Sequence, residues 1–110
     1  MRPALISGGL AVLASLALAL PASASGESAT FYSGADLSGT KSPVDLANGD
    51  CVNLAVPSKS GLNVSSADIE VFYNADCKPG LPGRSGDTYY VLGSLHQGNF
   101  SFAAVSYRVR

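Results

Sequence analysis

Beyond its first 24 residues, this 110-residue chain has almost no run of apolar residues at helical spacing. It also has only one histidine, His96, and only two cysteines, Cys51 and Cys77. No G-x-S-x-G nucleophile elbow, phosphate-binding loop or cofactor fingerprint occurs. A helical fold is therefore excluded. Because nothing groups a nucleophile with a base and an orienting residue, we expect no enzyme.

The chain also has no strong excess of positive or negative charge. Without Arg2, six of the seven basic side chains remain against eight acidic ones, which gives a net charge near −2. No basic stripe is available to a phosphate backbone, so nucleic acid is not an expected partner. Five of the six aspartates stand beside turn residues, where backbone capping explains them without catalysis: Asp36, Asp45, Asp50, Asp76 and Asp87.

The one long apolar stretch lies at the N-terminus. It ends at Pro21 and is followed by Ala22-Ser23-Ala24, a small-residue cleavage site of the A-x-A kind. The pattern predicts a helical secretory signal peptide over residues 1–24. The alternative is a membrane anchor, but only one charge flanks the segment. We therefore expect a secreted, extracellular, monomeric domain over residues 25–110, with no membrane span.

The cysteines bear on the stability of this small domain. Its 86 residues (110 minus 24) bury only about 60–65% of the surface of the unfolded chain. Cys51 and Cys77 predict one disulfide, because paired cysteines in small secreted domains are usually oxidised. A closed loop of about 27 residues contributes about 3–4 kcal/mol by the chain-entropy estimate. A metal-binding or redox pair is less favoured, since C-x-x-C spacing and histidine partners are lacking.

Three segments alternate apolar and polar residues, as half-buried antiparallel strands do. The more continuous apolar run Thr88–Leu92 predicts a more completely buried strand. Turn residues separate these segments at short intervals, so we expect an all-β sandwich or small barrel. The three alternating apolar sets are Val52, Leu54 and Val56; Ile69, Val71 and Tyr73; and Val105, Tyr107 and Val109.

The longest irregular segment is KPGLPGRSG, residues 78–86. Three glycines and two prolines in nine residues exclude a central strand and put this segment on the surface. It is either a tolerated hairpin insertion or a presented binding loop, held extended and anchored at its base by a disulfide. In the second interpretation the candidate binding residues are Lys78, Leu81, Arg84 and Ser85.

Part of the sequence occurs twice. FYSGADLSG begins at Phe31 and FYNADCKPG begins at Phe72, 41 positions later (31 to 72). A repeat of about this length indicates two supersecondary units that share one core. In both copies an aromatic pair precedes a glycine, which is Gly39 in the first copy and Gly80 in the second.

These motifs resemble the first hairpin of the βγ-crystallin Greek key. The last strand, Ser106 to Val109, is similar to the closing strand of that family. The resemblance implies an all-β, Greek-key β-sandwich of two similar motifs. The first motif would span about residues 29–71 and the second about 72–110.

Secreted microbial members of this family often bind Ca²⁺ through a stretch of the form [N/D]-[N/D]-x-x-[S/T]-S, which offers hard oxygen ligands. The present chain keeps Ser65 and Ser66 but lacks the two leading acids or amides. The resemblance therefore implies at most a degraded Ca²⁺ site, with Asn63, Ser65 and Ser66 as candidate ligands. No other cofactor is expected. Asn63 and Asn99 also begin N-x-[ST] sequons.

These features favour a secreted, non-enzymatic, small β-domain that acts as an extracellular binding module. The resemblance implies a protease inhibitor or an antimicrobial protein, as some small microbial relatives are. The partner would be an extracellular protein or surface that the sequence does not name. The alternative is a calcium-binding or purely structural extracellular βγ-crystallin protein.

Overall fold

The computed structural model describes residues 27–110, so the expected signal peptide over residues 1–24 lies outside the described residues. No helix within the described part is long and apolar enough to cross a membrane. The all-β prediction is confirmed for this part of the chain. Its elements are β2 (Ser28–Tyr32), β3 (Lys41–Pro43), β4 (Val52–Val64), β5 (Ile69–Phe72), the short 3-10 segment η2 (Ala75–Cys77), β6 (Tyr90–Leu92) and β7 (His96–Val109).

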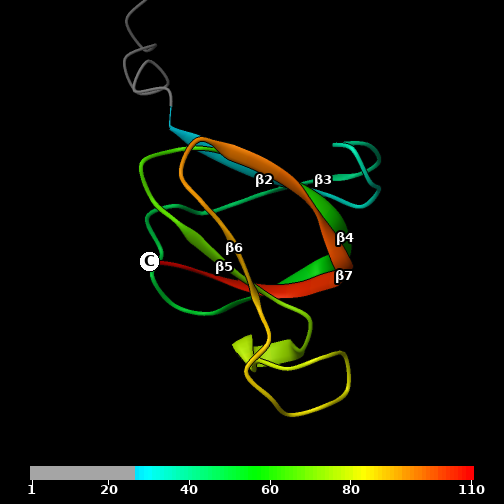
Figure 1. The fold of residues 1–110 in the computed structure, drawn as a ribbon. Coiled ribbons are helices and arrows are strands. Elements are labelled where there is room, and N and C mark those ends of the chain that lie inside the picture. Colours follow the sequence, from blue (N-terminus) through cyan, green and yellow to red (C-terminus); the bar gives the residue numbers. More distant parts are fainter. Residues whose placement is uncertain (1–26) are drawn as a thin grey trace, which may run out of the picture.

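The strands form a single antiparallel sheet in the order β3-β2-β4-β7-β5-β6. This order is symmetrical, because exchanging β2, β3 and β4 with β5, β6 and β7 reproduces it. We refer to residues 28–64 as the first half and to residues 69–109 as the second half. The two long central strands, β4 and β7, bend strongly, and their pairing, which shifts register between Asn53 and Ser60, joins the two halves (Figure 1).

The sheet curls around one apolar core. Phe31 of β2 packs against Phe100 and Tyr107 of β7, with ring centroids 5.9 and 5.3 Å apart. Alternation in the sequence correctly placed Ile69, Val71 and Tyr73 on one face, since all three lie in this core. Its buried members are Ala29, Phe31, Ile69, Val71, Tyr73, Leu92, Phe100, Ala104, Tyr107 and Val109.

The prediction of a more completely buried strand over Thr88–Leu92 was wrong. Only Tyr90–Leu92 of this segment forms a strand, β6, which lies at the edge of the sheet and pairs only with β5. Leu92 is buried, but Tyr89 and Val91 remain 40% and 38% exposed. Aromatic and β-branched residues favour edge and central strands alike, so composition did not distinguish the two.

Strand register relates the halves residue by residue. Phe31 of β2 lies opposite Gly61 of β4, as Val71 of β5 lies opposite Tyr107 of β7. Phe31 therefore corresponds to Val71, and the structural repeat spans 40 positions (31 to 71). The aromatic repeat that starts at Phe31 and Phe72 is displaced by one residue, and the second half begins with β5, before the expected boundary at Phe72.

Residue size is exchanged between these equivalent positions. A Cβ atom on Gly61 would lie 2.9 Å from the ring of Phe31 and 2.9 Å from Leu92, so the glycine makes room for the large aromatic residue. In the second half the small residue is Val71 and the large one is Tyr107, whose ring packs on Phe31. Each pair thus places one large and one small residue in the shared core.

The first hairpin, which joins β2 to β3, is held against the sheet by a buried serine and an exposed asparagine. The Ser60 hydroxyl donates to the carbonyl of Gly34 at 2.6 Å and accepts from the N–H of Leu37 at 2.9 Å. The side chain of Asn99 exchanges two hydrogen bonds with Asp36, at 2.8 and 2.9 Å. Asp36 and Leu37 both have positive φ, at 55° and 58°, so the turn folds tightly.

The second hairpin is held in the same way. The Ser106 hydroxyl donates to the carbonyl of Asn74 at 2.6 Å and accepts from the N–H of Cys77 at 3.0 Å. Asn53 exchanges two hydrogen bonds with Asp76, at 2.8 and 3.0 Å. Asp76 and Cys77 have φ of 60° and 54°, like their counterparts. Each half thus contributes the asparagine that holds the hairpin of the other.

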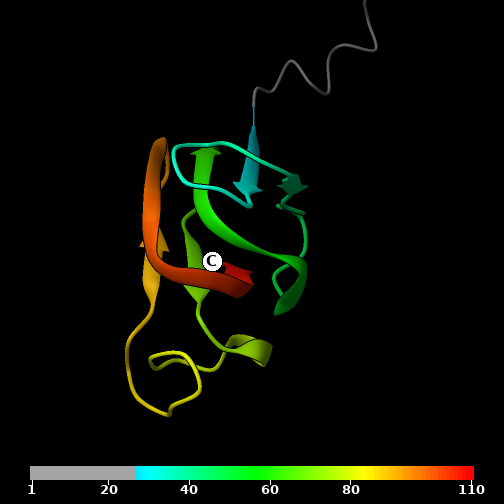
Figure 2. The same cartoon turned by 90° about the vertical axis from the view of Figure 1, so that its right-hand side faces the viewer.

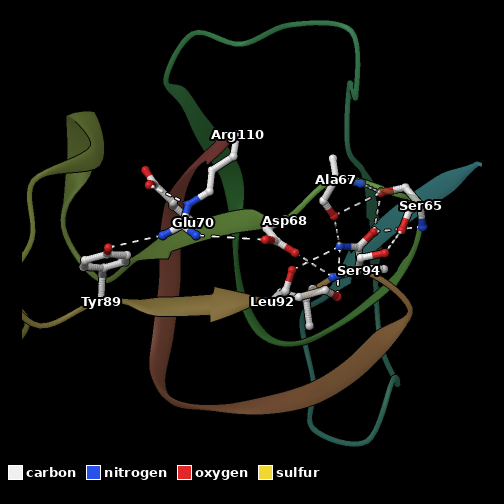
Figure 3. A network of polar contacts seen from close by, with 10 residues as sticks. Ser65, Ala67, Asp68, Glu70, Tyr89, Leu92, Ser94 and Arg110 are labelled. Atoms are coloured by element: carbon white, nitrogen blue, oxygen red, sulfur yellow. Dashed lines mark hydrogen bonds and ion pairs between the residues drawn. The ribbon is translucent and has the colours of Figure 1, made fainter.

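The outer face of the second half carries a network of charged side chains (Figure 3). The Glu70 carboxylate binds Arg108 at 2.8 Å and Arg110 at 3.1 Å, and Arg110 also approaches Asp68 and Tyr89. Burial by itself would raise the pKa of Glu70. The hydrogen bonds and positive charges of Arg110 and Arg108 outweigh it and hold that pKa below its ordinary value.

Glu70 should therefore add pH-dependent stability. Because its pKa is lower in the folded state, its contribution is full above the ordinary value of 4.5 and is lost as the pH falls through the folded pKa. We expect Glu70→Gln to reduce the free energy of unfolding by about 1–2 kcal/mol near neutral pH. The difference from wild type should shrink toward about pH 3. Urea unfolding at both pH values measures this.

The matched control is Asp50→Asn, which removes an exposed carboxylate outside the network. It should leave the pH dependence of the unfolding free energy nearly unchanged. If Glu70→Gln cost the same at both pH values, the ion pairs would not be the source of its stabilisation.

Candidate functional site

The predicted disulfide is confirmed. Cys51 and Cys77 are joined with an S–S distance of 2.05 Å and a Cα–Cα distance of 5.9 Å. Cys51 directly precedes β4, and Cys77 is the last residue of η2, immediately before the segment 78–86. The bridge therefore fixes the base of this segment, which we refer to as the loop, to a central strand.

The loop projects from the end of the domain opposite the start of β2 in both views (Figures 1 and 2). All four candidate binding residues, Lys78, Leu81, Arg84 and Ser85, are exposed there. Lys78, Arg84 and Ser85 line one hollow, whereas Leu81 does not. Three of the four predicted residues are thus brought together.

Relative to the first half, the loop is an insertion. Phe31 pairs with Ser42 across the first hairpin, 11 positions away (31 to 42). Val71 pairs with Tyr90 across the second hairpin, 19 positions away (71 to 90). The second hairpin therefore contains eight additional residues (19 minus 11). Since the first half forms the same strand pair without them, strand pairing does not require the added residues.

The side chain of Asn74 holds the backbone of the loop. Its amide nitrogen donates to the carbonyls of Gly80, Leu81 and Arg84 at 3.3, 3.1 and 3.2 Å. Its oxygen accepts from the N–H of Gly83 at 2.7 Å. The three carbonyls share the two hydrogens of one amide group. A single side chain therefore binds polar groups along most of the loop.

The loop is folded rather than extended as expected. Arg84 donates its N–H to the carbonyl of Leu81 at 2.9 Å, which closes a turn. The carbonyl of Arg84 faces inward, where a Cβ atom on Gly80 would collide with it. Gly80 has φ of 126° and Gly83 has φ of 76°. Glycine adopts such positive φ values freely, so the loop can fold back on itself at these two positions.

A hollow of about 530 Å³ lies against η2 and the loop. Its lining residues include the two cations Lys78 and Arg84, together with Ser85, Gly86 and the acidic residue Asp76. Neither cationic side chain has a hydrogen bond or ion pair within residues 27–110. The Asp76 carboxylate, in contrast, already accepts a hydrogen bond from β4. The hollow therefore offers two uncompensated positive charges.

Two of the three candidate calcium ligands are buried and bonded to one another. The Asn63 side-chain oxygen accepts from the N–H and the hydroxyl of Ser65, at 3.1 and 2.6 Å. Its nitrogen donates to the carbonyls of Ala67, Leu92 and Gly93 at 2.8–3.1 Å, in the network of Figure 3. The amide group thus occupies the point where three carbonyl oxygens converge, which is where a cation would bind.

The third candidate ligand, Ser66, lies apart from the other two. It is exposed, and its hydroxyl donates to the carboxylate of Glu27 at 3.3 Å. No group of three or more His, Cys, Asp or Glu side chains suited to a metal occurs within residues 27–110. The three residues therefore do not assemble a set of free oxygen ligands.

Burial also separates the two sequons. Asn63 is fully buried, and its amide nitrogen is engaged, so no glycan can be attached to it in the folded domain. Asn99 is exposed, but its amide nitrogen donates to Asp36. Only the second sequon is accessible.

The roles of Asn74, Asn53 and Ser106, which position the loop, were not predicted from the sequence. A signal was present: the dipeptide Ala35-Asp36 recurs as Ala75-Asp76, 40 positions later (35 to 75). This spacing would have aligned the two hairpins correctly. The longer aromatic match at 41 positions concealed it.

Asn74→Ala should release the loop without unfolding the sheet. The substitution removes four hydrogen bonds, all to the loop backbone. We expect amide exchange of Gly83 to accelerate about tenfold or more, while amides of β5 and β7 stay protected. Hydrogen exchange followed by NMR measures both.

Asn48→Ala is the matched control, because Asn48 caps only the N–H of Asp50 in a different turn. It should leave the exchange of Gly83 unchanged. Slow exchange of Gly83 in Asn74→Ala would mean that the loop is held by something other than this amide.

Comparison of the chain with protein-family models, with curated proteins and with solved structures found no match. The resemblance to the βγ-crystallin family, stated from the hairpin motifs, therefore stays a prediction.

Proposed function

We propose that this chain is a secreted, non-enzymatic binding module of the βγ-crystallin type and that the loop is its recognition surface. The observation that carries the proposal is the insertion of eight residues into one of two otherwise matching hairpins. Their backbone is bound by Asn74, while their side chains are exposed. A loop already held in one shape loses little conformational entropy on binding.

The fold supports the proposed relationship to the βγ-crystallin family. The symmetrical strand order and the two serine contacts are what a pair of Greek-key motifs, each with its own folded hairpin, would give. The disulfide supports secretion, because such bridges persist in oxidising compartments. The signal-peptide cleavage pattern that ends at residue 24 also supports secretion.

Binding by the intact loop is favoured over substrate-like protease inhibition. A substrate-like inhibitor must direct the carbonyl of its central residue to the oxyanion hole of a protease. The carbonyl of Arg84 instead turns toward Asn74. An antimicrobial role through anionic membranes is also less favoured, because the net charge is near −2 after removal of residues 1–24.

The calcium-binding alternative gains nothing from the geometry, because Asn63 and Ser65 are engaged with each other and with nearby backbone. A purely structural role leaves the insertion unexplained. The first hairpin forms its strand pair with eight fewer residues.

Deletion of residues 81–87 tests the proposal. It joins Gly80 to Thr88, as Gly39 is joined to Thr40 in the first hairpin. The shortened protein should fold and keep its disulfide, because Val71 and Tyr90 are then 12 positions apart (19 minus 7), one more than Phe31 and Ser42 in the first hairpin. It should no longer retain the proteins that the wild type captures from culture medium.

Leu95→Ala is the control for capture, since Leu95 is 73% exposed at another turn of the domain. It should capture the same proteins as wild type. If the correctly folded deletion variant captured them too, the loop would not be the recognition surface. Inhibition of serine or metalloproteases by wild type, abolished by Arg84→Ala, would favour the inhibitor form instead.

A further inference from the structure

We infer that the hollow beside the loop binds the carboxylate of an acidic peptide segment on an extracellular polypeptide. Lys78 and Arg84 supply the positive charge, and the backbone amides of Ser85 and Gly86 supply hydrogen-bond donors. The inference rests on the proposed function, because it names the chemistry that the loop recognises.

The cationic side chains of the domain differ in whether their charge is compensated. Arg108 and Arg110 bind Glu70 on the outer face of the sheet, so their charge is compensated locally. Lys78 and Arg84 have no such partner within the described residues, yet the fold of the loop returns both to one hollow. An incoming carboxylate would pair with two cations without displacing an existing partner.

The loop also leaves two backbone amides beside the hollow, those of Ser85 and Gly86, without acceptors in the described part of the chain. In a trans peptide the carbonyl and the following N–H point to opposite sides. Because the carbonyl of Arg84 faces Asn74, the N–H of Ser85 points away from it. No acceptor within residues 27–110 binds the N–H of Ser85 or of Gly86. Backbone amides that lack an acceptor and stand beside cations are available to an anion.

Asp76 opposes this charge but is held in place. Its carboxylate accepts from the Asn53 amide at 3.0 Å, and its N–H donates back to the same side chain at 2.8 Å. Two cationic residues and two residues with free amides therefore line the hollow, against one carboxylate already engaged with β4. The balance favours a negatively charged ligand.

The size of the hollow favours an anion carried on an organic body. At about 530 Å³ it lies within the roughly 300–1,000 Å³ typical of sites for organic ligands. A single inorganic oxyanion would leave most of it unfilled. Ala75 and Pro79 also line it, which gives the methylene groups of a glutamate side chain an apolar surface.

The test is an NMR titration of the secreted chain with acetylated, amidated triglutamate. The matched triglutamine peptide, inorganic phosphate and a sulfated oligosaccharide serve as separate arms. We expect triglutamate to shift the amide signals of Ser85 and Gly86, and triglutamine to leave them unchanged. Affinity should fall about tenfold in Lys78→Gln and in Arg84→Gln, and should weaken as salt is added.

Lys59→Gln is the control, because Lys59 is exposed on β4 and does not line the hollow. It should bind triglutamate like wild type. The inference is overturned if triglutamate shifts neither amide. It is also overturned if phosphate alone, or the sulfated oligosaccharide, gives the same shifts at equal or lower concentration.

Failure here and failure of the proposed function would look different. If the variant lacking residues 81–87 loses its captured proteins while triglutamate shifts nothing in wild type, the loop is the recognition surface for a partner of other chemistry. If that variant keeps its captured proteins, the proposed function fails whatever triglutamate does.

Discussion

The architecture depends on one repeated interaction, in which a buried serine hydroxyl bridges two backbone groups of a folded hairpin. Ser60 and Ser106 are both fully buried, and each donates to one carbonyl and accepts from one N–H of a turn. Leu37 and Cys77 have positive φ, and the turn residues lie outside the strands, so their backbone polar groups need another partner. Without the hydroxyl, a donor and an acceptor would stay unsatisfied, at about 1–3 kcal/mol each.

Because these contacts hold the base of each hairpin, the two halves can differ in the length of the hairpin beyond that base. The first hairpin is short, whereas the second carries eight additional residues on an equivalent base. Ser106 fixes Asn74 and Cys77, Asn74 in turn binds the loop, and the disulfide of Cys77 ties it to the start of β4. A rigid base therefore supports a loop whose side chains remain free to bind.

Several features were predictable because they follow from local pattern. Alternation identified Ile69, Val71 and Tyr73 as one face of a strand, and an even pair of cysteines gave the disulfide. The register of the repeat was not predictable from the aromatic pairs. Large and small residues are exchanged across the core, so Phe31 corresponds to Val71 rather than to Phe72. Asn74 could not be identified either, since its role depends on a loop that folds back over it.

The most direct test of this account is amide exchange at the two hairpins in Ser60→Ala and Ser106→Ala, with the exposed Ser101→Ala as control. We expect Ser60→Ala to accelerate amide exchange at Leu37 about tenfold or more, and Ser106→Ala to accelerate amide exchange at Cys77 by a similar factor. The control should change neither. If Cys77 stayed as protected in Ser106→Ala as in wild type, the serine contacts would not hold the hairpins, and the basis for the loop would be lost.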